Sequence, residues 1–430
     1  MIFREYDIRG IYPKEVNEDL AYKLGKIFAF SVKEKAIIVG RDGRKGSPSM
    51  HESFKNGVKA LGKDVIDLGL CTTPMFHFAV QKLSLPGAMI TASHNPKQFN
   101  GFKFSKAGGV PFPPKKFEFL LKKSIKEKRK IGFEQKINIL SSYAKFIKKF
   151  LNKDIENLKI LIDFGNGAAN LVSEIFEDLP IEIISINNEI DPNFKGRGPD
   201  PIAGLKKLGR LIKKEKANFG IAYDGDGDRL LFLDELGNFI KAEAIAAIIA
   251  NKILRRRQKA VYSIDCSRIF EEAIALKKCK ATPCGVGLMP VFKAMRAEKA
   301  ILGVETSGHY YFKSFGYLDN PEIALMQIIN IISKAKAPLS ELVGPYKRYV
   351  SKVLDLQSKN PQKAIRRVEE RFKKLKPSRI FHVDGIYIEF KDFWFNLRQS
   401  KTEDRLLRLR IEGKTSEAVE RAFEKIIELL

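Results

Sequence analysis

One pattern recurs three times along the chain: a short apolar run, a turn with Gly or Ser and polar groups, and then a stretch of helical character. The segments are AIIVGRDGRKGSPS (36–49), KILIDFGNGAANLVSEIF (159–176) and AVYSIDCSRIFEEAIAL (260–276). Apolar runs that alternate with helices are typical of α/β layers with a largely parallel sheet. Three separated units predict repeated α/β domains in a chain whose length allows roughly two to four domains.

The C-terminal part of the chain has a different pattern. Residues 385–413 alternate apolar and polar side chains in two runs around a polar turn, which predicts antiparallel strands. Thr415 or Ser416 is expected to cap a closing helix. The buried stripe of this helix would hold Val419, Phe423, Ile426, Ile427 and Leu430. We therefore expect a smaller α+β domain at this end.

The charge balance limits the classes of partner. The chain has 77 Lys+Arg against 51 Asp+Glu, a formal net charge of +26. Such an excess favours nucleic acid or small phosphorylated substrates. Much of the Lys lies in stretches such as 122–130 and 366–377, which we interpret as solvated helix faces. Because no basic motif is interleaved with aromatic residues, we expect no nucleic-acid partner.

The cysteines and apolar runs indicate the compartment. Cys71, Cys266, Cys279 and Cys284 form no CxxC pair, which is typical of free thiols in a reducing compartment. The longest apolar run, 244–250, is far shorter than the ~20 residues of a membrane span. The first residues, MIFREYDIRG, lack the apolar core of a signal peptide. We expect a cytoplasmic protein without a membrane partner.

An acidic turn, AYDGDGDRLLF (222–232), places Asp224, Asp226 and Asp228 between two apolar runs. The intervening glycines let alternate carboxylates converge, and converging carboxylates suit Mg²⁺ or Ca²⁺. An EF-hand is a rival because Glu235 occupies the twelfth loop position, but Arg229 replaces the glycine at the sixth. A solvated acidic turn is the other alternative. The guanidinium of Arg229 suits phosphate.

A second polar turn lies in AMITASHNPKQFNGFK (88–103). Ser93 follows an apolar run, His94 is its neighbour, and Lys103 follows ten residues later. The Ser93 hydroxyl is a candidate nucleophile or phosphate acceptor. An ordinary Ser/Asn/Pro turn is an equally good interpretation of this segment alone.

TASHNP…NGFK and DGDGDR, in this order and spacing, resemble the α-D-phosphohexomutase family, and most closely its phosphomannomutase/phosphoglucomutase branch. GVETSGHYYF (303–312) resembles the family's sugar-binding loop, and RQSKTE (398–403) resembles its phosphate-binding loop. FREYDIRG (3–10) and GRDGR (40–44) resemble the family's opening. The resemblance runs from residue 3 to the closing helix.

The resemblance implies an α/β fold with three similar α/β domains of mixed sheets and a smaller α+β C-terminal domain, arranged around a central cleft. Each domain would supply one loop. Domain I, 1–137, would carry the phosphoserine loop, and domain II, 138–236, the metal-binding loop. Domain III, 237–344, would carry the sugar-binding loop, and domain IV, 345–430, the phosphate-binding loop.

The resemblance also implies a chemistry. A phosphoserine at Ser93 would transfer its phosphoryl group to a hexose monophosphate of mannose or glucose, and the resulting bisphosphate would reorient and return its other phosphate. This is an isomerase reaction of carbohydrate metabolism, with glucose 1,6-bisphosphate or mannose 1,6-bisphosphate as activator and a monomer or homodimer as the expected state. The implied catalytic residues are Ser93, His94, Lys103, Arg229 and Arg9; Ser93, Asp224, Asp226 and Asp228 would hold Mg²⁺; Tyr6, Glu305, Ser307, His309, Arg398, Ser400, Lys401 and Thr402 would bind substrate.

Two positions depart from the family pattern. Asp265 stands where the branch commonly has a lysine that faces the site, and Leu288 stands where a histidine is common. Thr306, at the variable position of the sugar-binding loop, is unlike the residues typical of the named branches. These departures leave two alternatives open: a phosphoglucosamine mutase, and a catalytically weakened member of the fold that binds phosphosugars. His51 and His77 lie in helix-like stretches, and we expect structural roles without partner side chains.

Overall fold

The computed structural model describes residues 2–400 and 405–430. The chain forms two compact units, each of them discontinuous in sequence. The first unit holds Met1–Ala242 and Ser307–Leu342, and the second holds Glu243–Thr306 and Val343–Leu430. No described helix combines the length and apolar content that crossing a membrane requires.

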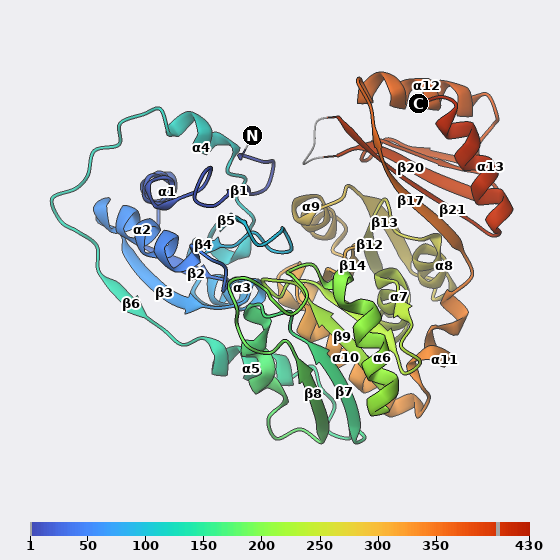
Figure 1. Cartoon of the computed structure of the whole chain (residues 1–430), viewed down its shortest axis with the longest axis horizontal. Helices are drawn as coiled ribbons and strands as arrows, with labels where there is room; N and C mark the ends of the chain where they lie inside the picture. Colours follow the sequence, from blue (N-terminus) through green and yellow to red (C-terminus); the bar gives the residue numbers. More distant parts are fainter. Residues whose placement is uncertain (1, 401–404) are drawn as a thin grey trace. The chain divides into compact units, whose positions relative to one another are not determined.

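The first unit begins with a six-stranded mixed sheet of order β1-β5-β4-β2-β3-β6. Strands β2, β3, β4 and β6 run parallel, whereas β5 is antiparallel to β1 and β4. Helices α1 and α2 pack against this sheet through a core rich in phenylalanine (Figure 1). The elements are β1 (Ile8–Ile11), α1 (Glu18–Ser31), β2 (Ala36–Arg41), α2 (Ser47–Ala60), β3 (Asp64–Leu70), α3 (Thr73–Leu83), β4 (Gly87–Ile90), β5 (Phe99–Ser105), α4 (Lys115–Leu120) and β6 (Glu134–Lys136).

A second sheet of the first unit has the order β11-β10-β9-β7-β8. Strands β7, β8 and β9 are parallel, and β10 and β11 are antiparallel additions. The strand–turn–helix expectation for 159–176 is modified here, because residues 168–176 form a 3₁₀ helix instead of an α-helix. The elements are α5 (Leu140–Lys148), β7 (Leu158–Asp163), β8 (Ile181–Ile186), α6 (Leu205–Glu215), β9 (Phe219–Tyr223), β10 (Leu230–Asp234) and β11 (Phe239–Ile240); β15 (Tyr310–Phe312), β16 (Leu318–Asp319), α10 (Pro321–Ala335) and α11 (Leu339–Val343) follow later in the chain.

The second unit contains a third α/β region. Its strands β12 and β13 pair in parallel, as do β12 and β14. The elements are α7 (Ala242–Ile253), β12 (Lys259–Ser263), α8 (Arg268–Leu276), β13 (Lys280–Cys284), α9 (Leu288–Glu298) and β14 (Leu302–Val304).

The second unit ends in an antiparallel sheet of order β17-β21-β20-β19-β18. Apolar residues of α12 and α13 form one core with β19, β20 and β21, so both helices cover the same face (Figure 1). The elements are β17 (Val350–Gln357), α12 (Pro361–Lys373), β18 (Arg379–Phe381), β19 (Ile386–Glu389), β20 (Phe393–Gln399), β21 (Leu406–Gly413) and α13 (Ser416–Ile427). The expected fold class, three α/β domains and an α+β C-terminal domain, is confirmed.

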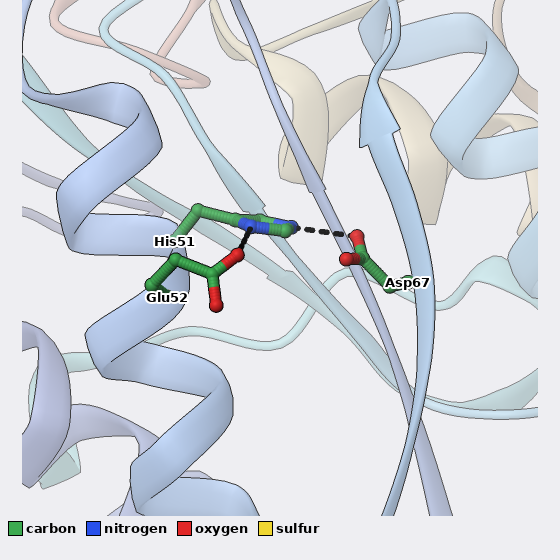
Figure 2. Close-up of side chains that lie close together, drawn as sticks. All are labelled: His51, Glu52 and Asp67. Atoms are coloured by element: carbon green, nitrogen blue, oxygen red, sulfur yellow. Dashed lines mark ion pairs between the residues drawn. The ribbon is translucent and has the colours of Figure 1, made fainter. Parts of the chain in front are cut away.

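Two local expectations are corrected. The basic stretch 122–130 forms no helix and lies exposed between α4 and β6, because Ile125 is its only large apolar side chain and gives it no face to bury. His51 lies in α2 but has charged neighbours: its Nε2 lies 3.0 Å from Asp67 Oδ1, and its Nδ1 lies 3.7 Å from Glu52 Oε1 (Figure 2). Lys55 Nζ lies 2.7 Å from Asp67 Oδ2. This group of charges links α2 to β3.

Candidate active site

The serine loop connects β4 to β5, and its conformation is held from both sides. Ser93 is buried and has a positive φ of 51°, a backbone state that costs a non-glycine residue about 1 kcal/mol or more. The Ser93 amide donates to Thr91 Oγ1 at 2.8 Å. Arg44 donates to the carbonyls of Ser93 and Asn95, and Arg9 Nη1 donates to the Ala92 carbonyl at 2.9 Å. The surrounding hydrogen bonds therefore fix the backbone of the loop at Ser93.

The acidic turn connects β9 to β10, as the sequence predicts. The carboxylates of Asp224, Asp226 and Asp228 are buried, and each offers an oxygen within 4.8 Å of the others. Asp224 Oδ1 accepts from the amides of Asp228 and Arg229 at 3.1 and 3.2 Å. These bonds curl the turn so that the three side chains converge.

The serine loop and the acidic turn lie in direct contact. Ser93 Oγ donates to Asp224 Oδ2 at 2.7 Å, although 131 residues separate them. Lys103 Nζ lies 2.7 Å from Asp226 Oδ2 and 2.6 Å from Asp228 Oδ2. A buried hydroxyl, three carboxylates and one ammonium are thus gathered in one place.

Electrostatics in this cluster are dominated by burial and by the converging charges. Burial raises the pKa of Asp224, and Asp228 and Asp226 raise it further. Burial also opposes ionisation of Asp228, but Lys103 and His309 outweigh it and hold its pKa well below the usual range. Burial, Arg229 and Arg9 lower the pKa of His94, so its imidazole is neutral near pH 7.

The donor set fits a hard divalent cation. Asp226 Oδ1 is buried and accepts no hydrogen bond from the residues that the structure describes. A buried carboxylate oxygen without a donor is costly unless a cation compensates it. Three converging carboxylate oxygens are the ligand type that Mg²⁺ prefers. The residues present therefore fit the predicted magnesium site.

Two residues of the expected sugar-binding loop lie beside the acidic turn. His309 Nε2 is 3.2 Å from Asp228 Oδ1, and Ser307 Oγ is 2.7 Å from His309 Nδ1. Ser93 Oγ lies 3.4 Å from His94 Nδ1. The remaining predicted residues of the first unit, Tyr6, Arg9 and Arg229, are half-buried. Arg9 forms an ion pair with Asp7 at 2.7 Å.

The second unit holds the other predicted binding residues. Glu305 is buried and accepts from the amide of Gly287, directly before α9. Arg398 and Ser400 are buried at the end of β20. Arg398 Nη2 lies 3.6 Å from Asp265 Oδ2. The predicted residues Lys401 and Thr402 lie outside the described residues.

Sequence reasoning missed two residues of the cluster. Thr73, at the start of α3, donates its hydroxyl to Asp226 Oδ2 at 2.6 Å across 153 residues. No local signal marks it, since a threonine beside a helix start is usually a cap. Arg44 lies in the GRDGR motif, but the motif does not indicate that its guanidinium donates hydrogen bonds to the carbonyls of the serine loop.

Comparison with known proteins gives a family for the whole chain. Models of the α/β/α domains I, II and III of phosphoglucomutase/phosphomannomutase match residues 1–131, 141–237 and 241–349. A phosphomannomutase from Methanocaldococcus jannaschii is 36% identical over 446 aligned positions, covering 100% of this chain and 97% of the relative.

Solved structures agree. A phosphoglucomutase/phosphomannomutase family protein from Burkholderia thailandensis superimposes with a TM-score of 0.91 at 26% identity, covering 100% of this chain and 96% of that one. An Aspergillus fumigatus N-acetylphosphoglucosamine mutase, solved with GlcNAc-6P and magnesium, shares the fold at 13% identity and a TM-score of 0.63, covering 100% of this chain and 95% of that one. The chain therefore belongs to the phosphoglucomutase/phosphomannomutase family, whose enzymes are intramolecular phosphotransferases.

Proposed function

We propose that this enzyme interconverts the 1- and 6-phosphates of mannose, glucose or both through a phosphorylated Ser93. The observation that carries the proposal is the 2.7 Å contact between Ser93 Oγ and Asp224 Oδ2. It joins a buried hydroxyl on a loop with a fixed backbone to a cluster of carboxylates suited to a cation. The phosphomannomutase relative at 36% identity supports a hexose phosphate as the substrate.

Asp224, Asp226 and Asp228 would hold Mg²⁺ together with the phosphate on Ser93. The fungal mutase that shares this fold was solved with magnesium. The bound ion would neutralise charge on the oxygens of the transferred group. The residues around the loop serve the same end. Lys103 and Arg229 would supply positive charge, and Arg9 holds the loop through its hydrogen bond to the Ala92 carbonyl.

In the first half-reaction, the bond between phosphorus and Ser93 Oγ breaks as a hydroxyl of the hexose monophosphate bonds to phosphorus. The substrate hydroxyl loses its proton, and neutral His94, whose Nδ1 lies 3.4 Å from Ser93 Oγ, would accept it. The product is a hexose 1,6-bisphosphate, and Ser93 Oγ is left as the leaving group, stabilised by the cations around it. After the bisphosphate turns around, Ser93 Oγ bonds to the phosphorus of its other phosphate as the bond from that phosphorus to the sugar oxygen breaks. His94 would return its proton to that sugar oxygen, which restores the phosphoserine and the neutral imidazole and releases the isomer.

The remaining predicted residues would bind the parts of the sugar that do not react. Glu305, Ser307 and His309 would hydrogen-bond its hydroxyl groups, and Tyr6 would line the floor near the serine. The second phosphate would lie on the loop that begins with Arg398 and Ser400 and continues through Lys401 and Thr402.

Glucosamine phosphate is an alternative substrate. Asp265 beside Arg398 makes the phosphate loop less cationic, and Leu288 puts an apolar side chain at the start of α9. A glucosamine phosphate would gain from extra negative charge near its amine. Turnover measured side by side on glucose, mannose and glucosamine 1-phosphates distinguishes these substrates. No turnover of any of them would favour a phosphosugar-binding protein.

Intact mass spectrometry tests the covalent scheme. Wild-type protein incubated with Mg²⁺ and glucose 1,6-bisphosphate should carry a population heavier by about 80 Da, the mass of one phosphoryl group. Ser93→Ala should lose this population and its turnover. Ser49→Ala, at an exposed serine of α2, should keep both. Wild-type turnover in Ser93→Ala would refute the phosphoserine.

A further inference from the structure

A cavity of about 520 Å³ lies in the C-terminal sheet domain, between the end of α12, the middle of α13 and the turn that joins β19 to β20. Its walls include Phe372, Phe390 and Phe393. The rings of Phe390 and Phe393 stack at 4.9 Å with an interplanar angle of 24°, and Phe372 lies 6.1 Å from Phe390. Phe390 and Phe393 are only half-buried, so this aromatic wall keeps accessible surface.

Cations surround the aromatic wall. The lining includes Lys376, Lys391, Arg421 and Lys425, against one acidic residue, Asp392. Within 2–400 and 405–430, none of these three lysines forms an ion pair, whereas Arg421 interacts with Glu417. Three ammonium groups without an ion pair, together with Arg421, outnumber the one carboxylate of this lining, and this excess favours a ligand with negative charge.

The cavity is separate from the proposed phosphate loop. The two sites lie at opposite ends of β20: Phe393 begins the strand, and Arg398 lies near its end. Five residues of an extended strand span roughly 17 Å. A ligand in the cavity therefore leaves Arg398 and Ser400 uncovered.

We propose that this cavity binds a small phosphate with a planar aromatic ring, the chemistry of a mononucleotide. A volume of about 520 Å³ is within the range of small-molecule sites. The Phe390–Phe393 wall offers a stacking surface for the ring, and Lys391 and Lys425 offer donors to the phosphate. A phosphosugar without an aromatic ring would interact with the lysines but could not stack on the phenylalanine rings.

Calorimetric titration of the full-length enzyme with ADP tests this site. The titration contains saturating glucose 1,6-bisphosphate, which should occupy the proposed phosphate loop so that ADP cannot bind there. ADP should bind with one-to-one stoichiometry, and adenosine and pyrophosphate should each bind at least about tenfold more weakly, because each lacks one half of the recognised group. Lys391→Gln/Lys425→Gln should weaken ADP binding about tenfold or more.

Lys363→Gln/Lys374→Gln is the matched control, since it removes two exposed lysines of the same domain outside the cavity. It should change ADP affinity less than twofold, and both double variants should keep the wild-type circular dichroism spectrum. Equal losses of ADP affinity in the two double variants would overturn the proposal, because the effect would then come from general surface charge and not from the cavity. Absence of ADP binding below about 1 mM, or pyrophosphate binding as tightly as ADP, would overturn the proposal. Equal binding of glucose 6-phosphate and ADP would do the same.

Discussion

Asp265 is one of the two positions at which the resemblance predicts a departure from the family pattern, and its contacts suggest a consequence. Its Oδ1 accepts from Ser263 Oγ at 2.6 Å, and its Oδ2 lies 3.6 Å from Arg398 Nη2. Both Asp265 and Arg398 are largely shielded from water, so their attraction is weakly screened. A carboxylate at this place lowers the positive potential that the proposed phosphate loop offers to its substrate.

Asp265→Asn should therefore lower the KM for glucose 1-phosphate by about two- to tenfold, since about 1 kcal/mol of repulsion would be removed. The kcat should change little, because the Ser93 loop is untouched. Ser263→Ala is the control: it removes a hydrogen bond to Asp265 but keeps the charge, and its KM should stay near the wild-type value. An increased KM in Asp265→Asn would mean that the carboxylate orients Arg398 instead of competing with phosphate.

The ammonium group of Lys103, on β5, forms ion pairs with the carboxylates of the acidic turn. Burial opposes its charge, but Asp226 and Asp228 outweigh burial and raise the pKa of Lys103. Lys103→Met should lower the melting temperature without Mg²⁺, because the buried carboxylates of Asp226 and Asp228 lose their counter-charge. Added MgCl₂ should then raise the melting temperature of this variant by at least about 3 °C more than that of the wild type.

The control for this measurement is Lys106→Met, at an exposed lysine just after β5. Its response to MgCl₂ should equal that of the wild type. If Lys103→Met responds to MgCl₂ no more than the control, the ammonium does not compete with a cation for these carboxylates.

At the scale of single residues, the sequence was informative where chemistry is encoded locally. The spacing of the three aspartates predicted a turn with converging carboxylates, and the structure has it between β9 and β10. The contact of this turn with Thr73 spans 153 residues and has no local signature. Side chains that meet only after folding are therefore the ones that sequence reasoning missed.

At the scale of elements, caps were predicted better than buried faces. Thr415 Oγ1 accepts from the Ala418 amide at 3.2 Å and starts α13, as expected. Val419 and Ile426 are buried as predicted, but Ile427 is 38% exposed and Ala422 takes its place in the core. Helical periodicity defines a stripe, whereas the width of the stripe depends on the sheet beneath it.

The charges that join α2 to β3 and β6 allow a test of one element. Lys55 Nζ lies 2.7 Å from Asp67 Oδ2 and 2.6 Å from Glu134 Oε1, and its side chain is buried. Lys55→Met should lower the free energy of unfolding by about 3 kcal/mol, since Asp67 remains as a buried charge with less compensation. Denaturant titration followed by circular dichroism measures this change.

Lys59 provides the comparison for Lys55. It contacts the same Glu134 at 2.7 Å, but its side chain is 20% exposed and no ion pair with Asp67 is present among the described residues. Lys59→Met should cost less than about 1 kcal/mol. Similar losses in the two variants would show that burial of the ammonium does not control the stability of this link.

At the scale of the whole molecule, the repeated strand–turn–helix pattern predicted the fold class but not the division into units. The first unit recruits Ser307–Leu342 from much later in the chain. Buried polar contacts attach this segment to the rest of the unit. Tyr143 Oη donates to Glu322 Oε2 at 2.6 Å, and Asn320 Nδ2 donates to Tyr143 Oη at 2.8 Å. A tyrosine of α5 and an acid of α10 have no pairing signal in the sequence.

Glu322 makes the stability of the first unit depend on pH. Burial raises its pKa to about 7, and hydrogen bonds from Tyr143 and Tyr223 only partly oppose this; Asp319, with a pKa also raised to about 7 by burial, adds to the effect. The folded state therefore keeps a proton that the unfolded state releases at lower pH. Between about pH 4.5 and pH 7 the unfolded state binds fewer protons, so the free energy of unfolding falls as pH rises.

Glu322→Gln should reduce the fall of the unfolding free energy with rising pH by up to about 3 kcal/mol. The pH dependence that remains should come from Asp319. Urea titrations at pH 5 and pH 8, followed by circular dichroism, measure the difference between the two proteins. The only tryptophan, Trp394, lies in the second unit, so its emission reports on that unit separately. The substitution should shift the pH dependence of the circular dichroism transition more than that of the Trp394 transition. If the wild type and Glu322→Gln lose equal stability from pH 5 to pH 8, the pKa of Glu322 is not raised in the folded protein.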